Sequence, residues 1–138
     1  MTKRARGLPH LPPAGAAAIT YRDNLAEVRE FVRARATGAG LSRSRTRDLV
    51  LAASELAANT LSHTNDTGIL YMWIMPGEVL CQVRDSGQLA DLSAVRTRPP
   101  PDSGHGHGLW IVHQLCDTVD IRTGPGGTTI CLHMKLGG

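Results

Sequence analysis

Apolar residues in the first half of this sequence recur at the spacing of helices. The first stripe consists of Leu25, Val28, Phe31 and Val32. It begins after Asp23, the expected N-cap, and stops at Gly38 and Gly40, which predicts a first helix. A longer segment from about Ser42 to Leu61 carries a second stripe and predicts a second helix. The second stripe consists of Leu49, Ala53, Leu56 and Ala57.

Shorter apolar runs in the rest of the chain predict strands. Residues 69–75 and 79–84 flank Pro76-Gly77-Glu78, a turn signal typical of a hairpin. The other expected elements are an edge strand at Ala17–Tyr21, a helix at Gly108–Leu115, and strands near Thr118–Arg122 and Thr128–Leu136. Because strands and helices do not alternate one by one, this order favours an α+β fold. We expect a two-layer α/β sandwich with the helices on one face of a mostly antiparallel, mixed sheet.

The 138 residues of the chain fit one domain. Residues 1–15 are rich in proline and glycine and predict a flexible N-terminal lead-in, so we expect the domain to span 16–138. The segment 86–105 shows little periodicity and includes the proline run 99–101. It predicts a long loop, and a loop of that length in a small domain is often functional.

Charge changes this picture little. The chain has 15 Lys+Arg against 12 Asp+Glu, a formal net charge of +3, and its basic residues form only two small clusters. These clusters are Lys3, Arg4 and Arg6 near the start of the chain, and Arg43, Arg45 and Arg47 at the start of the second helix, just before its apolar run. The first cluster has no interleaved aromatic residues, and the second is typical of the first turns of a helix. Nucleic-acid binding is therefore disfavoured.

Cysteine, histidine and hydropathy restrict the class further. Cys81, Cys116 and Cys131 are odd in number and widely spaced in apolar surroundings, which favours buried, reduced thiols over disulfides. His105 and His107 suggest zinc, but no Cys or carboxylate pair stands at a zinc-ligand spacing. No apolar stretch reaches the length of a membrane span, and the N-terminus lacks a signal core. We expect a cytoplasmic protein without a membrane partner.

Polar residues on the second helix form the first candidate site. Glu55 and Asn59 lie four positions apart and so share one helix face. An Asn oxygen can bind a Mg2+ that phosphate also holds, and a carboxylate nearby can orient water or accept a proton. Such a pair is commonly only solvated, but here small apolar residues surround it, which favours a functional interpretation.

Two further motifs lie at the ends of expected strands and helices. Asp85 and Gly87 follow the strand 79–84, where a carboxylate can accept a hydrogen bond from a purine amine and a glycine lets the backbone turn. Between residues 104 and 108, glycines at alternate positions precede a helix, so backbone N–H groups and the helix dipole can bind phosphate. No strand precedes these glycines, so the segment is not a dinucleotide fingerprint.

The motifs Glu55-Leu-Ala-Ala-Asn59, Asp85-Ser-Gly87, Gly104-x-Gly106-x-Gly108-Leu109 and Gly127-Thr128-Thr129 follow one another in a specific order. Together they resemble the ATP-binding superfamily of gyrase, histidine kinases and related chaperones, which has the Bergerat-type ATP-binding fold. Within it, the chain looks most like the bacterial anti-sigma-factor serine kinases. The resemblance covers residues 16–136.

The resemblance implies a role for each motif residue. Glu55 would be the catalytic base or water-orienting carboxylate, and Asn59 would bind Mg2+. Asp85 would recognise adenine, assisted by Thr128, with Thr129 as the neighbouring alternative. The remaining nucleotide-binding residues would be Gly87 beside adenine, and Gly104, Gly106, Gly108 and Leu109 in the phosphate lid.

The resemblance also implies ATP and Mg2+ as cofactors and two protein partners. Members of this family phosphorylate a serine on an anti-sigma antagonist protein, sequester a sigma factor and in many cases form homodimers. The alternative is a catalytically quiet, nucleotide-dependent protein-interaction module, which the proline run 99–101 in the lid favours. Nothing in the sequence supplies the dimerisation helices and phosphoacceptor histidine of a full sensor kinase.

Overall fold

The computed structural model describes residues 11–63, 67–85, 107–124 and 126–137. In chain order its elements are β1 (Ala17–Tyr21), α1 (Leu25–Gly38), α2 (Arg43–His63), β2 (Gly68–Met75), β3 (Glu78–Asp85), α3 (His107–Leu115), β4 (Thr118–Gly124) and β5 (Gly127–Lys135). Every element expected from the sequence is present, with ends that differ by a few residues. The expected loop at 86–105 and most of the lead-in at 1–15 lie outside the described residues.

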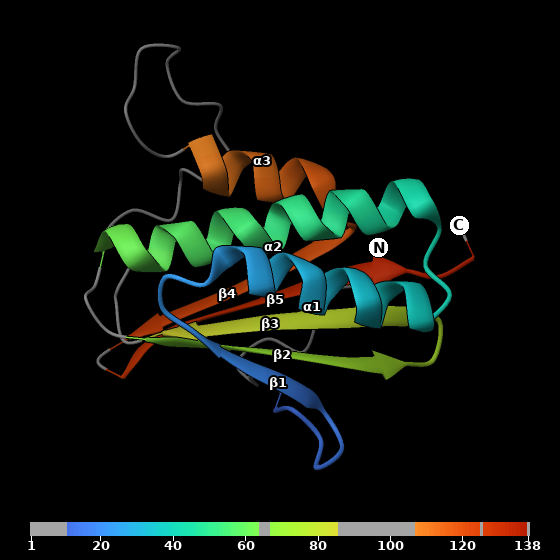
Figure 1. Cartoon of the computed structure of the whole chain (residues 1–138), viewed down its shortest axis with the longest axis horizontal. Coiled ribbons are helices and arrows are strands. Elements are labelled where there is room, and N and C mark those ends of the chain that lie inside the picture. Colours follow the sequence, from blue (N-terminus) through green and yellow to red (C-terminus); the bar gives the residue numbers. More distant parts are fainter. Residues whose placement is uncertain (1–10, 64–66, 86–106, 125, 138) are drawn as a thin grey trace.

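The five strands form one sheet in the order β1-β2-β3-β5-β4 (Figure 1). All four pairings are antiparallel, so the mixed sheet expected from the sequence is corrected to an antiparallel one among the described strands. The β2–β3 and β4–β5 pairs are hairpins, whereas β3 and β5 pair across the sequence and join the two hairpins. The position of β5 beside β3 decides which residues of the candidate site become neighbours.

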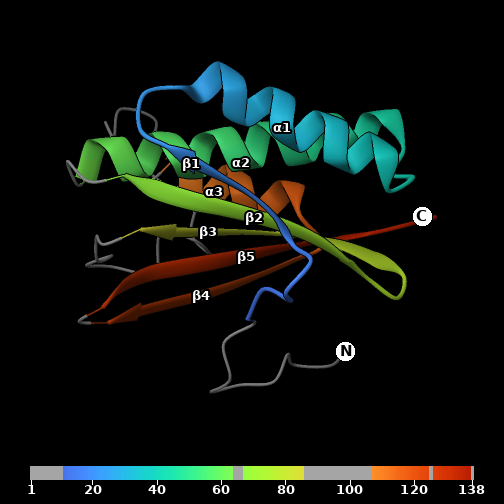
Figure 2. The ribbon, with the colours of Figure 1, turned by 60° about the horizontal axis from the view of Figure 1, so that its bottom comes forward.

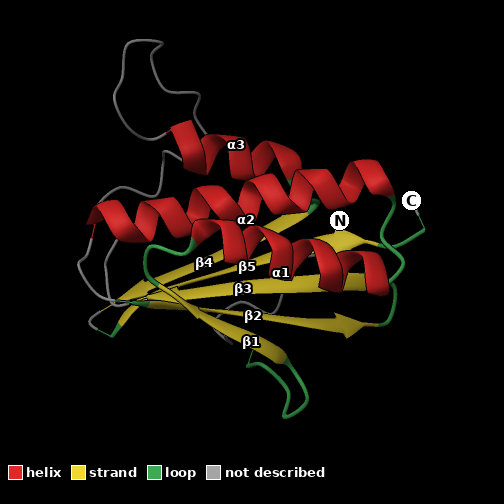
Figure 3. Ribbon diagram, in the orientation of Figure 1, coloured by secondary structure: helices red, strands yellow, loops and turns green. Residues whose placement is uncertain are grey.

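The three helices cover one face of this sheet, as predicted (Figures 2 and 3). α2 packs between α1 and α3 and also contacts β3. The core lies between the layers and includes Leu49, Leu56, Leu70 and Leu132, each at most 2% exposed. Small residues of α2 are also fully buried there: Ala52, Ala53 and Ala57. A helix with a flat alanine surface can lie close to the strands beneath it.

The start of α1 differs from the sequence prediction. Asn24, not Asp23, is the N-cap, and its side chain makes no capping hydrogen bond to the helix backbone. Its Oδ1 instead accepts a hydrogen bond from the Arg22 backbone N–H at 2.8 Å, and its Nδ2 donates to Glu27 at 2.7 Å. These hydrogen bonds connect the turn after β1 to the first turn of the helix. They occupy the Asn24 side chain, which makes no capping hydrogen bond to the helix backbone.

Local turn chemistry explains the other boundaries. Ser42 caps α2, because its Oγ accepts a hydrogen bond from the Arg45 backbone N–H at 3.2 Å. α1 ends at Gly38, and just beyond its C-cap Gly40 has φ +94°, a left-handed conformation that favours glycine. In the β2–β3 hairpin, Gly77 has φ +80° after Pro76, which is the residue pair of a type II turn. These glycines sit where the sequence predicted the chain to stop or turn.

The second face of the sheet carries a smaller apolar cluster of Trp73, Leu80 and Cys131. A histidine on this face is also buried: His133 is 1% exposed, and its Nε2 lies 2.9 Å from the Asp120 Oδ2. The three cysteines are free and buried, as predicted. None of the described helices is both long and apolar enough to cross a membrane.

Candidate functional site

Three segments that carry the predicted motifs reach the same end of the domain. The C-terminal half of α2, the last residue of β3 and the first turn of α3 all lie at one end of the sheet (Figure 1). α2 packs against both α3 and β3, so the helix with Glu55 and Asn59 lies over the strand that ends in Asp85. Residues separated by about 30 positions in the sequence therefore lie at the same end of the sheet.

Asp85 is the last residue of β3 rather than the first residue after it. In the antiparallel ladder it lies directly opposite Thr128 of β5. Residues opposite one another point to the same face of a sheet, with Cβ atoms about 5 Å apart. Val83 and Ile130, two positions away on each strand, belong to the core beneath the helices. Asp85 and Thr128 therefore face the helix layer together.

The register separates the two threonine candidates. Thr129 lies opposite Arg84, and successive strand residues point to opposite faces. Its side chain therefore points to the face of the sheet away from the helices, while Thr128 points toward them. Only Thr128 can act beside Asp85 on the helix-covered face.

A second threonine, which the sequence interpretation missed, forms a hydrogen bond with the Thr128 hydroxyl. Thr123 of β4 lies opposite Thr128, and their hydroxyl oxygens are 3.1 Å apart. Thr128 is only 4% exposed, so this hydrogen bond fixes the direction of a buried hydroxyl. The signal was present in the sequence, because the two threonines stand symmetrically about the expected turn at 124–127.

Glu55 is half-buried on α2, between the buried residues Ala52 and Leu56 and the exposed Ala58. The preceding residue, Ser54, accepts a hydrogen bond at 3.3 Å from Arg29 of α1. Glu55 therefore lies at the border between the helix layer and solvent. Asn59 lies one turn farther along the same helix, where the structure describes the backbone only.

The N-terminal end of α3 completes the described part of the site. The helix begins at His107, so Gly108 and Leu109 form part of its first turn. Val112 is fully buried and fixes α3 against the core. The first N–H groups of a helix have no partners within it and favour an anion at this end. Gly87, Gly104 and Gly106, the other predicted glycines, lie outside the described residues.

Two of the three buried cysteines, Cys81 and Cys116, are not nucleophiles at neutral pH. Burial raises the pKa of the Cys81 thiol well above its usual value, with smaller contributions from Cys131 and Cys116. Burial also raises the pKa of Cys116 to about 12, an effect that nearby Arg45 partly opposes. A thiol must lose its proton to attack, and these two thiols keep theirs at neutral pH.

The described groups have hydrogen-bonding chemistry that suits a nucleotide. A carboxylate on a strand end accepts from an amine, a buried hydroxyl stands beside it, and a helix start is suited to phosphate. Glu55 adds a carboxylate on α2, and Asn59 follows it one turn later on the same helix. The donor set therefore fits a nucleotide held between the sheet end, α2 and α3.

Comparison with solved structures supports the same fold. The chain is similar to the RsbU and RsbW domains of Rv1364c from Mycobacterium tuberculosis, with 23% identity and a TM-score of 0.64 over 87% of this chain and 32% of that one. It is also similar to the EL346 blue-light activated histidine kinase of Erythrobacter litoralis, at 22% identity and a TM-score of 0.53 over 70% and 32%. The histidine kinase domain of the same protein matches at 19% identity and a TM-score of 0.54, over 81% of this chain and 59% of that one. The chain thus spans about a third to three-fifths of the chains it resembles.

No curated protein matches the sequence. The model of the histidine kinase-like ATPase domain, in contrast, matches residues 20–134, which is most of the chain and includes every candidate site residue. With its antiparallel sheet, its helices on one face and the site at the sheet end, this chain belongs to the histidine kinase-like ATPase domain family.

Proposed function

We propose that this domain binds ATP with Mg2+ at the end of the sheet formed by Asp85, Thr128, α2 and α3. The observation that carries the proposal is the register that places Asp85 directly opposite the buried Thr128, beneath the helix that holds Glu55 and Asn59. The Asp85 carboxylate accepts a hydrogen bond from the adenine amine, and the Thr128 hydroxyl supports that contact. Gly87 leaves room for the ring, and Gly104, Gly106, Gly108 and Leu109 enclose the phosphates.

We further propose that the domain is a protein-serine kinase. Asn59 holds Mg2+, which neutralises phosphate charge when it is bound. Glu55 accepts the proton of the incoming hydroxyl or orients it, because it lies one helical turn before Asn59 at the border with solvent. Catalysis then depends mainly on positioning the serine of a partner protein in line with the phosphate.

The biological role we propose is that of a cytoplasmic anti-sigma factor. In this role the domain phosphorylates an anti-sigma antagonist protein and, without that antagonist, binds a sigma factor, as a monomer or a homodimer. The fold shared with the RsbU and RsbW domains of Rv1364c supports this assignment, as does the motif set gathered at the sheet end.

The first test is calorimetric titration of ATP and ADP, with and without Mg2+, into the wild type and Asn59→Ala. We expect Mg-dependent binding that Asn59→Ala weakens by at least about tenfold, the range of a lost charge-assisted contact. Glu30→Ala, an exposed change on α1, is the control and leaves affinity unchanged. No binding to wild type, or full affinity in Asn59→Ala, contradicts the nucleotide site.

The second test concerns the kinase step. Glu55→Gln keeps the size and half-buried position of the side chain but removes its ability to accept a proton. We expect it to bind ATP normally and to lose transfer of the labelled phosphate to a candidate antagonist by at least about a hundredfold. If transfer is absent in the wild type while nucleotide still controls partner binding, the domain is a quiet interaction module and the kinase proposal is wrong.

A further inference from the structure

A cavity of about 370 Å³ lies at the end of the sheet opposite the nucleotide site. Val79, near the start of β3, lines it, whereas Asp85 ends the same strand. Six residues of extended chain separate the two, a distance of about 20 Å. The cavity is therefore a separate site, and nothing in the proposed nucleotide chemistry uses it.

The cavity exists because β1 is shorter than its neighbour. β1 pairs with β2 only as far as Ala17 opposite Met72, and a turn closed by the Ala16 backbone N–H bonding to the Pro13 oxygen at 3.0 Å then leads the chain away. The last residues of β2 have no β1 partner on that side. Ile74 is consequently 59% exposed at the cavity, although its neighbour across the ladder, Val79, is buried.

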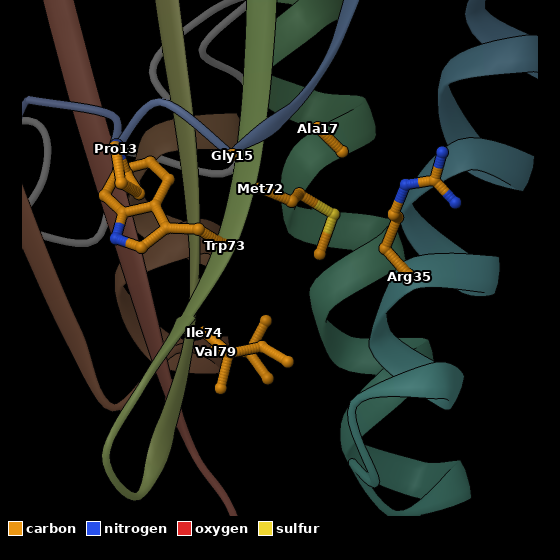
Figure 4. A pocket seen from close by; sticks show the side chains of 8 residues that line it. All are labelled: Pro13, Gly15, Ala17, Arg35, Met72, Trp73, Ile74 and Val79. Carbon is orange, nitrogen blue, oxygen red and sulfur yellow. The ribbon is translucent and has the colours of Figure 1, made fainter.

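The walls are apolar on both sides of this strand edge. Met72 and Val79 present core side chains toward the helix layer, while Trp73 lies on the other face, as Figure 4 shows. A volume of this size and an apolar lining are typical of sites for small organic molecules. The apolar lining therefore suits the aliphatic or aromatic part of a small molecule.

The described residues that line the cavity include one cation, Arg35. Arg35, in the last turn of α1, lines the cavity, and its guanidinium stacks over the Phe31 ring at 4.6 Å. Among the residues that the structure describes, no acidic side chain lies within ion-pair distance of it. Its neighbour Arg33, in contrast, is paired with Glu30 at 2.5 Å. A guanidinium held by stacking, with its donors available, is suited to a carboxylate.

We propose that this cavity binds a small amphipathic carboxylate, with its apolar body along Trp73 and the exposed side chain of Ile74, over the buried Met72 and Val79, and its anionic group at Arg35. Arg35, the one basic residue among the described residues that line the cavity, favours such a ligand over a neutral or cationic one of the same length. Because the site lies about 20 Å from Asp85, its occupancy does not require nucleotide.

The probe we would use is decanoate, followed by the fluorescence of Trp73 in a Trp110→Phe background, which leaves Trp73 as the one remaining tryptophan. We expect a saturable change below the concentration at which decanoate forms micelles. Decyltrimethylammonium, with the same chain and the opposite charge, should give no saturable change.

Two variants test the position of the ligand. Arg35→Gln, at an exposed position, should weaken decanoate binding by about two- to fivefold, whereas Arg33→Gln should not change it. Gly15 lines the cavity, and a Cβ added there meets no other atom within 4 Å, so the fold should accommodate Gly15→Leu. A leucine at this lining position should compete with the ligand for space and weaken binding by at least about tenfold. If Gly15→Leu does not fold, the Arg35→Gln and Arg33→Gln pair still decides.

Three results would overturn the proposal. Equal responses to decanoate and decyltrimethylammonium would show adsorption to apolar surface alone. Full decanoate affinity in both Arg35→Gln and Gly15→Leu would place the ligand elsewhere. No response to decanoate would also reject the site, and the open edge of β2 would then be better suited to a strand added by a partner protein.

Discussion

The pairing of Asp85 with Thr128 is the feature of the site that substitutions can test most directly. We would replace Asp85 by Asn and Thr128 by Val, singly and together, and use Thr129→Val as the matched control. Thr129 is the next residue of the same strand, but it lies opposite Arg84 and points to the other face of the sheet. Valine keeps the β-branched shape that suits a strand and removes only the hydroxyl.

The magnitudes follow from the kind of hydrogen bond that each change removes. Asp85→Asn loses a charged acceptor, worth about 1.5–3 kcal/mol, so ATP affinity should fall by about tenfold to 150-fold. Thr128→Val loses a neutral hydroxyl worth about 0.5–1.5 kcal/mol, or about two- to twelvefold. Thr129→Val should change affinity by less than about 0.5 kcal/mol. Since Thr128 acts beside Asp85, the double variant should lose less than the sum, by at least about 0.5 kcal/mol.

Calorimetric titration of ATP and GTP provides the assay, and the ratio of the two affinities reports on adenine directly. Adenine offers an amine donor where guanine has a carbonyl acceptor, so Asp85→Asn should reduce the preference for ATP. Thermal unfolding of each variant without nucleotide separates binding from stability. Thr128→Val removes one partner of the Thr123 hydroxyl and should itself cost about 1 kcal/mol.

Two outcomes would refute this reasoning. If Thr129→Val weakens ATP binding as much as Thr128→Val, the face assigned by the register does not decide which threonine acts. If the Asp85→Asn and Thr128→Val effects add fully while the ATP preference stays unchanged, the two residues do not meet the same part of the ligand.

Three further predictions concern the scaffold. A Cβ on Gly68 would overlap the ring of Tyr21, which lies opposite it and is 1% exposed, so Gly68→Ala should destabilise the fold by about 1–3 kcal/mol in urea unfolding. Burial raises the pKa of Cys116 from 9.0 to about 12, so the unfolded state loses its proton first. The free energy of unfolding should therefore fall as pH rises through this window, and Cys116→Ala should reduce that slope. Arg45 bridges the start of α2 to Asp117 at 3.3 Å, and because the pair is about a third exposed, Arg45→Gln should cost only about 0.2–1 kcal/mol, measured by thermal unfolding.

Local patterns were sufficient to predict the elements of this fold. The apolar stripes predicted α1 and α2, and Pro76-Gly77 predicted the β2–β3 turn, because each signal depends on residues close together in the chain. The N-cap of α1 was assigned wrongly to Asp23, since Asp and Asn are both good caps and stand side by side. Asn24 is distinguished in the structure by local side-chain hydrogen bonds with Arg22 and Glu27, which cap propensity alone does not predict.

Non-local pairing determines what the sequence could not predict. The choice between Thr128 and Thr129 depends on the register of β5 against β3, and a shift of one residue would exchange their faces. The role of Thr123 and the cavity at Arg35 depend in the same way on which strands pair and where β1 ends. Periodicity gives the face of a residue within its own strand but not its neighbour on the next one.

The two halves of the site are held by different forces, and this determines how the site can change. Asp85 and Thr128 are fixed by backbone hydrogen bonds of the β3–β5 ladder, so their separation depends little on the helices. Glu55 and Asn59 reach the same end only through the packing of α2, whose buried alanines Ala52, Ala53 and Ala57 let the helix approach the sheet. A shift of α2 would therefore separate the proposed Mg2+ and base positions from the proposed adenine position without breaking either pair. α1 and α3 both pack against α2, so a partner that binds either helix would be able to shift α2 and change the proposed kinase site.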